Sequence, residues 1–318
     1  MAVVLTADLR QVDTTRARQP DAEGVIERDG VRVAWERYGD GSPTILLMPT
    51  WSLFHSRHWK LQVAYLARLF RVVTFDGRGN GRSDRPVDPA AYADTEFVAD
   101  ALAVLDATDT ELAVVAGLSM GAGYALRLAA DHPDRVLGAV FLGASIPVFA
   151  RPGQTPANQV PPGFEGPEGD DPVWGKYNAD YWRRDLPGFA AWFVAGKLFS
   201  EPHSTKLIED GIGWALETDA ESLIASVYGS YLWPPADRQH DPDEGRALPF
   251  IRRVRCPSLV IHGDDDRITP PALAERLAAE LGAPLVTIRG GGHVPMARWP
   301  VLVNRLIRDF VRGLGAVR

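Results

Sequence analysis

Short apolar runs of strand length alternate with helical patterns along most of this chain. The runs share a bounded, continuously apolar character: Thr44–Met48, Val72–Phe75, Leu112–Ala116, Val136–Leu142, Leu259–Ile261 and Leu285–Ile288. The helical patterns lie between and after them, near His58–Phe70, Asp94–Ala107, Gly121–Asp131, Pro271–Leu281 and Pro300–Val311. Strands that are apolar throughout are buried on both faces, which is typical of parallel sheets. The sequence therefore predicts an α/β fold with a mostly parallel central sheet and helices on both faces.

This pattern divides the chain into an arm, a core and an insertion. Residues 1–24 are polar and aperiodic and predict a loosely held N-terminal arm. Residues 25–145 and 250–318 carry the alternation and predict one core, which opens with a hairpin around Asp29-Gly30. Residues 146–249 interrupt the alternation and predict an inserted cap.

The insertion has a composition of its own. Prolines and glycines crowd residues 147–172, which predicts an irregular connection and suggests a mobile lid. Helical stretches follow near Tyr177–Arg184, Pro187–Leu198 and Ala220–Tyr228. The segment carries about half of the chain's aromatic residues, among them Trp182, Trp192 and Trp214. These rings either form the small core that a helical insertion needs or line an apolar pocket, and both interpretations remain open.

Composition excludes several functional classes. The longest apolar runs are far below the ~20 residues of a membrane span. A net charge of −7 without a basic block makes nucleic acid and anionic membranes poor candidate partners. The one cysteine, Cys256, cannot form an internal disulfide. The first residues have neither the basic region nor the apolar stretch of a signal peptide, so we expect a cytoplasmic protein.

The most informative motif is Gly-x-Ser-x-Gly, in which an apolar strand runs through Gly117, Ser119 and Gly121 into a helix. This strand–turn–helix context is that of a nucleophile elbow. The turn strains Ser119 and exposes its hydroxyl, while the glycines allow strand and helix to approach closely. The N–H of Met120, at the helix start, is then expected to face a developing oxyanion.

A nucleophilic serine needs a base and an acid that orients the base. The last predicted strand ends in a glycine run that leads to His293, and such a run lets the loop fold back toward the serine. The preceding strand is followed by Asp264, Asp265 and Asp266, each a candidate acid. The predicted order is thus serine, acid, histidine, with each residue after a strand.

With these motifs the chain resembles the α/β-hydrolase fold family over roughly residues 25–145 and 250–315. The family pattern Gly-x-x-Asp-x-x-x-Pro matches Gly263, Asp266 and Pro270, so the resemblance implies that Asp266 is the triad acid, with Asp264 and Asp265 as alternatives. The loop Asp76–Ser83 also matches the family, where it shapes the domain and has no catalytic role.

The sequence departs from many relatives after the first central strand. Pro49 and Thr50 stand where those relatives carry His-Gly, which implies that the N–H of Trp51, or alternatively of Thr50, completes the oxyanion hole. Thr50 and His55 are further candidates for the pocket wall, and His58 either borders the pocket or packs at the helix start.

These residues together predict acyl transfer to water. Ser119, Asp266 and His293 would hydrolyse a small ester or lactone with an apolar or aromatic group, without metal or organic cofactor. The same triad supports carbon–carbon bond hydrolysis in diketone-like compounds, and also acyltransferase or perhydrolase activity. A non-catalytic ligand-binding homologue is the alternative from another class. The oligomeric state cannot be inferred from the sequence.

Overall fold

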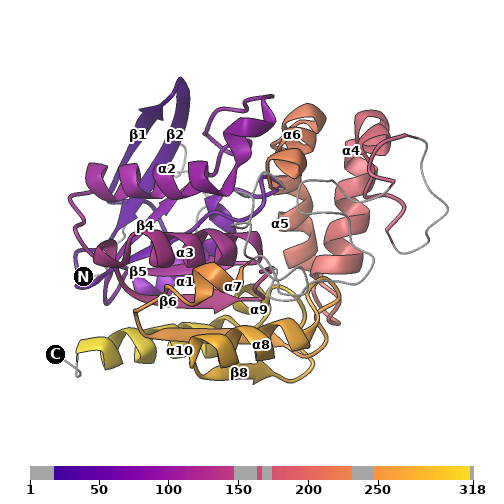
Figure 1. Ribbon diagram of the computed structural model, residues 1–318. Coiled ribbons are helices and arrows are strands. Elements are labelled where there is room, and N and C mark those ends of the chain that lie inside the picture. Colours follow the sequence, from indigo (N-terminus) through magenta and orange to yellow (C-terminus); the bar gives the residue numbers. More distant parts are fainter. Residues whose placement is uncertain (1–17, 147–162, 167–173, 231–246, 316–318) are drawn as a thin grey trace, which may run out of the picture.

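The computed structural model describes residues 18–146, 163–166, 174–230 and 247–315. Eight strands in these residues form one sheet in the order β1-β2-β4-β3-β5-β6-β7-β8 (Figure 1). The strands are β1 (Ala22–Arg28), β2 (Val31–Tyr38), β3 (Thr44–Leu47), β4 (Arg71–Phe75), β5 (Ala113–Leu118), β6 (Val136–Leu142), β7 (Ser258–Gly263) and β8 (Leu285–Ile288). The pairs from β4–β3 to β7–β8 are parallel, as predicted.

The sheet begins earlier than the sequence indicated. Strand β1 starts at Ala22, inside the segment predicted to be an arm, and pairs antiparallel with β2 around Asp29 and Gly30. Both turn residues have a positive φ, as a tight two-residue turn requires. β1 is an edge strand whose side chains are only half-buried or exposed, so polar residues such as Glu23 leave no apolar run to recognise.

Helices cover both faces of the sheet because neighbouring side chains of a strand point to opposite sides. In β3, Ile45 and Leu47 join one buried cluster, whereas Leu46 joins the other. The first cluster includes buried residues of α1 (Lys60–Leu66) and α10 (Pro300–Gly315). The second includes α2 (Asp94–Ala107), α3 (Met120–Asp131) and α8 (Pro271–Leu281). This three-layer arrangement is the predicted one.

Helices also occupy the described part of the segment between β6 and β7, and lie together at one end of the sheet (Figure 1). They are α4 (Ala179–Phe193), the π-helical turn η5 (Val194–Leu198), α5 (Thr205–Ala215) and α6 (Ala220–Ser230). Two helices predicted separately meet in α4 at a kink, where Asp185 has φ −149° and ψ 66°. Most of the proposed lid, residues 147–172, lies outside the described residues.

Helix α5 was not predicted from the sequence. Its two glycines, Gly211 and Gly213, lower helix propensity and obscure the pattern. Gly211 has a packing reason, because a Cβ there would lie 2.8 Å from Cγ1 of Val194. Gly211 therefore allows α5 to lie close against η5.

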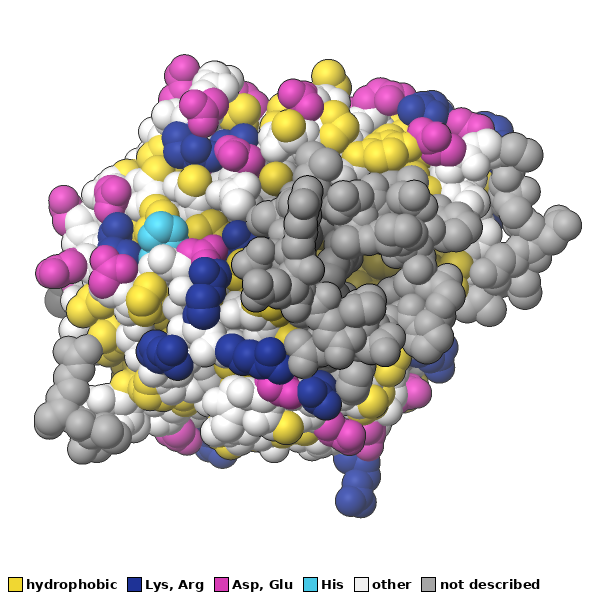
Figure 2. All heavy atoms as spheres, in the orientation of Figure 1, with side chains coloured by type: hydrophobic (Ala, Val, Ile, Leu, Met, Phe, Trp, Pro, Cys, Tyr) yellow, Lys and Arg dark blue, Asp and Glu magenta, His cyan; other side chains and the backbone are white. Residues whose placement is uncertain are grey.

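Short helices complete the described structure: η2 (Ser56–Trp59), η3 (Pro89–Tyr92), η4 (Pro133–Arg135), α7 (Leu248–Ile251) and α9 (Pro295–Arg298). Acidic and basic side chains are interspersed on the face of the core that Figure 2 shows. Within the described ranges, every helix is too short or too polar to cross a bilayer.

Candidate active site

Ser119 occupies a strained turn between β5 and α3. Its φ of 55° and ψ of −119° are unusual for a residue with a side chain. The glycines make this turn possible: a Cβ on Gly117 would lie 2.1 Å from the carbonyl oxygen of Gly121, and one on Gly121 would lie 2.2 Å from that of Pro49. The elbow geometry expected from the motif is therefore present.

His293 and Asp266 form a buried pair beside this turn. Nδ1 of His293 lies 2.8 Å from Oδ2 of Asp266, and both side chains are almost fully buried. The second carboxylate oxygen accepts hydrogen bonds from the N–H groups of Ile268 (2.8 Å) and Thr269 (2.9 Å). Burial raises the pKa of Asp266, but the His293 ring and these hydrogen bonds outweigh it, so the net pKa is lowered. The carboxylate is thus ionised at neutral pH.

The two alternative aspartates have other partners. Asp264 accepts a hydrogen bond from the N–H of Gly290 at the surface, and the side chain of Asp265 is 57% exposed. A third group, His262, contacts the pair from the other side: its Nε2 lies 3.5 Å from Oδ2 of Asp266 and 2.9 Å from the carbonyl oxygen of Thr269. Burial lowers the pKa of His262. Of the three aspartates, only Asp266 contacts His293.

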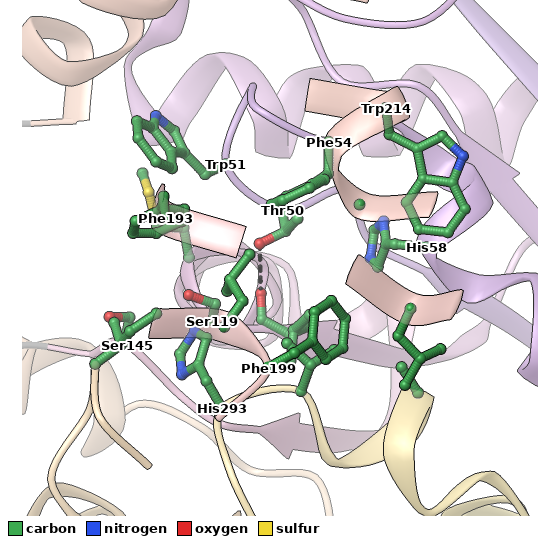
Figure 3. A pocket seen from close by; sticks show the side chains of 18 of the residues that line it. Thr50, Trp51, Phe54, His58, Ser119, Ser145, Phe193, Phe199, Trp214 and His293 are labelled. Atoms are coloured by element: carbon green, nitrogen blue, oxygen red, sulfur yellow. Dashed lines mark hydrogen bonds between the residues drawn. The ribbon is translucent and has the colours of Figure 1, made fainter. Parts of the chain in front are cut away.

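Ser119 and His293 lie on the same side of one cavity (Figure 3). No hydrogen bond joins the serine hydroxyl to the imidazole among the described residues. Such bonds are often long in empty sites and tighten when substrate binds. The absence of this hydrogen bond therefore does not argue against a pairing of Ser119 with His293.

The loop after β3 borders the cavity beside the start of α3. The hydroxyl of Thr50 donates to the carbonyl oxygen of Leu118 at 3.0 Å, which fastens the loop to β5 (Figure 3). Thr50 is absent from the described residues with positive φ, so the position does not need the glycine found in many relatives. In the described part of the chain, the N–H groups of Trp51 and Met120 have no hydrogen-bond acceptor.

The cavity has a volume of about 440 Å³ and mostly apolar walls. Residues from the core loops form one part of the wall and include Thr50, Trp51, Met120 and Ser145. The insertion supplies the remainder, including Phe193, Phe199, Leu207 and Trp214. Thr50 and Trp214, both candidates for the pocket wall, line this cavity.

Three residues predicted to line the pocket do not line this cavity: His55, Trp182 and Trp192. Trp182 is 1% exposed and packs among the rings of Phe164 and Phe189, with its indole N–H donating to the carbonyl of Lys176. These rings belong to the buried core that holds the helices of the insertion together, along with aliphatic residues such as Leu223 and Val227.

Trp192 packs against Trp174 and Phe193, and His55 pairs with Glu217, Nε2 to Oε1 3.3 Å. These positions correct the pocket prediction. Aromatic content alone could not separate the rings of the core from those of the cavity.

Several wall residues were not selected from the sequence. Ser145, Lys60 and Phe54 line the cavity, and so does His58, which the sequence placed either here or at the helix start. Ser145 follows β6, so the rule that placed the other side chains at strand ends would have found it. Phe54 and Lys60 carry no comparable motif. Among the described residues, no group of three potential metal ligands is found.

A family comparison agrees with this geometry. The model of the alpha/beta hydrolase fold matches residues 43–297, which is more than half of the chain. The chain belongs to the α/β-hydrolase fold family. The insertion of this α/β hydrolase lies between β6 and β7.

Individual relatives differ in what they are named for. The chain is 30% identical to 2-hydroxymuconate semialdehyde hydrolase of Pseudomonas sp. (strain CF600), over 92% of this chain and 94% of that protein. It is 26% identical to the bifunctional esterase/perhydrolase DCH of Acinetobacter calcoaceticus, over 91% and 99%. The curated α/β hydrolases similar to this chain thus span more than one activity.

Solved structures share the fold. The enol-lactonase from Burkholderia xenovorans LB400 superposes with a TM-score of 0.72 at 21% identity and covers 91% of this chain and 100% of that one. A thermophilic esterase from Thermogutta terrifontis has a TM-score of 0.72 at 25% identity and covers 93% and 99%. At these identities, the likeness concerns the α/β-hydrolase architecture.

Proposed function

We propose that the protein is a serine hydrolase that cleaves a carboxylic ester or lactone through an acyl-enzyme on Ser119. The observation that carries this proposal is the buried His293–Asp266 pair, 2.8 Å between Nδ1 and Oδ2, on the same side of an apolar cavity as the strained Ser119. Esterases and an enol-lactonase among the similar proteins support it.

The proposed reaction begins with proton transfer from the Ser119 hydroxyl to Nε2 of His293. The serine oxygen attacks the ester carbonyl, whose oxygen becomes negative and receives hydrogen bonds from the N–H groups of Met120 and Trp51. Each such donor typically contributes ~3–4 kcal/mol to the transition state. The ionised Asp266 holds the imidazole in the tautomer with a proton on Nδ1 and stabilises the imidazolium.

Collapse of the tetrahedral intermediate then expels the alcohol, which takes a proton from His293. Water attacks the acyl-enzyme with His293 again as base, and Ser119 is released with the acid product. These steps require neither metal nor organic cofactor. The substrate we propose is a small molecule with an apolar or aromatic group, because rings such as Phe193, Phe199 and Trp214 line the cavity.

Carbon–carbon bond hydrolysis is the second candidate. It is favoured by the 30% identity to a protein named 2-hydroxymuconate semialdehyde hydrolase. Such an activity would use the same triad but would turn over simple esters poorly. We also propose that residues 146–249 act as a cap, because their described helices supply much of the cavity wall.

The test is hydrolysis of p-nitrophenyl esters from acetate to laurate by the wild type and by Ser119→Ala. We expect activity in the wild type and at least a thousandfold lower kcat in the variant. A fluorophosphonate should label Ser119, as located by peptide mass spectrometry. Label on Ser145, the other serine in the wall, would contradict the assignment.

The remaining outcomes separate the candidates. A wild type that is labelled at Ser119 but hydrolyses no ester favours carbon–carbon cleavage. A wild type that is neither labelled nor active overturns the enzyme proposal and favours a ligand-binding homologue.

A further inference from the structure

His58 lies in the cavity wall on the side away from Ser119. It belongs to η2, at the end of the loop that follows β3, and its residue is 7% exposed. Figure 3 shows it with Trp214 on one side of the cavity, while Ser119, Ser145 and His293 lie on the other. The proposed chemistry gives His58 no role.

The tautomer of His58 follows from the hydrogen bond of its ring. Nδ1 lies 2.8 Å from the carbonyl oxygen of His55. A carbonyl oxygen can only accept, so Nδ1 carries the proton and Nε2 presents a lone pair in the neutral ring. Burial lowers the pKa of His58 to about 4, against weaker opposing effects of the His55 hydrogen bond and the Asp76 charge. The ring is therefore neutral at physiological pH.

Nε2 of His58 is a buried acceptor without a partner among the described residues. The ring packs on Trp59 at 4.9 Å between centroids. The nearby cation of the wall, Lys60, is ion-paired with Asp210 and lies over the Trp214 ring. A buried polar group without a hydrogen bond costs free energy, and such groups in native proteins call for an explanation.

We propose that Nε2 of His58 accepts a hydrogen bond from a hydroxyl group of the substrate. The substrate class is then esters or lactones that carry a hydroxyl remote from the scissile carbonyl, with an apolar body between the two. The carbonyl lies at Ser119, the body contacts rings such as Phe199, and the hydroxyl reaches His58. This inference rests on the proposed function for the carbonyl end and on the His58 geometry for the other end.

The test uses ester pairs that differ only in hydroxyl against methyl. One series contains ethyl esters of para-hydroxyphenyl-alkanoic acids of increasing chain length, each with its para-methylphenyl counterpart. A second series places the group in the alcohol part, as tyrosol acetate against its para-methyl analogue. Wild type should favour the hydroxyl member at the matching length by about 5- to 150-fold in kcat/KM, mainly through KM.

Two variants of His58 and one control identify the acceptor. His58→Phe keeps a ring but removes the acceptor, and should bring the hydroxyl-to-methyl ratio to about one. His58→Gln can place an amide oxygen near the position of Nε2 and should restore part of the preference. Phe54→Leu changes an apolar part of the same wall and should leave that ratio as in the wild type.

Each result of these assays either supports or overturns the proposed role of His58. A ratio near one at every length in the wild type, as expected if a water molecule occupies Nε2, overturns the proposal, and so does an unchanged ratio in His58→Phe. Hydrolysis without hydroxyl preference leaves the proposed function intact. If no ester is hydrolysed, calorimetric titration of the same pairs into Ser119→Ala still measures the preference, which should be lost in the double variant with His58→Phe.

Discussion

The two walls of the cavity are built in different ways. The core wall is held by directional contacts: the strained turn at Ser119, the 2.8 Å contact between His293 and Asp266, and the hydrogen bond from Thr50 to β5. The insertion wall is held by packed aromatic rings, such as Trp182 on Phe189 at 4.5 Å between centroids. The core thus fixes the positions of the residues of the proposed reaction, whereas the insertion shapes the space available to the substrate.

Two of the contacts between the core and the insertion involve the loops that carry the candidate site residues. The ring of Trp51 packs into the aromatic core of the insertion, and its indole N–H donates to the hydroxyl of Ser226 at 3.0 Å. On the other side, the buried carboxylate of Glu201 accepts a hydrogen bond from the N–H of Gly292 at 2.7 Å, next to His293. The insertion therefore contacts both the proposed oxyanion loop and the histidine loop. Substitutions in either wall can test how the two walls differ.

The largest effect is expected on the core wall. Asp266→Asn keeps the size of the side chain but lets the imidazole take the wrong tautomer, so kcat should fall about 10⁴-fold. Asp265→Asn is the matched control, and because this side chain is exposed it should retain wild-type kcat. Steady-state ester hydrolysis measures both. A loss in Asp265→Asn with little change in Asp266→Asn would reverse the assignment.

A smaller effect, on stability, is expected from the insertion wall. Trp182→Ala removes a fully buried ring outside the cavity and should lower the free energy of unfolding by about 3–5 kcal/mol. Trp214→Ala removes a half-buried ring that lines the cavity, and should mainly shift the preferred acyl chain toward longer esters. Denaturant unfolding and the p-nitrophenyl ester series measure the two effects. Equal changes in both variants would show that core and cavity rings are not separable.

The smallest effect is expected on stability at acidic pH, and it comes from His58, which lies where the two walls meet. His58 has a pKa of about 4 in the folded protein and about 6.5 when unfolded, so the unfolded state binds its proton more readily. As pH falls from 6.5 to 4, this difference in pKa lowers the free energy of unfolding by on the order of 3 kcal/mol. Above pH 6.5 His58 has no effect on the pH dependence of stability, and below pH 4 the loss stays constant. Unfolding of His58→Phe, measured against pH beside the wild type, should lack this component; parallel curves would contradict the buried neutral ring.

Much of the core could be predicted from sequence because its signals are local. The strand patterns located β3 to β8 within a few residues, and the Gly-x-Ser-x-Gly turn located the strained serine, since the glycines are needed where Gly117 meets Gly121. The choice of Asp266 among three neighbouring aspartates came from resemblance alone. The contact with His293 depends on how two separate loops fold back, which no local pattern encodes.

The insertion could be predicted less well because its signals depend on packing. Aromatic content indicated a ring-rich region, but whether a ring joins the core, as Trp182 does, or the cavity, as Trp214 does, depends on helix orientation. Helix α5 escaped prediction because the glycine that weakens its pattern is required by a neighbouring side chain.

The parallel sheet, the covering helices and the turn that exposes Ser119 can be read from the sequence, because hydrophobic periodicity and glycine placement act over a few residues. Three features depend on the tertiary structure: which aspartate meets His293, which rings surround the cavity, and the position of His58 in the cavity wall, where its Nε2 has no partner among the described residues. Those outcomes arise where segments far apart in the chain exclude water together, and burial of that kind is a property of the whole fold.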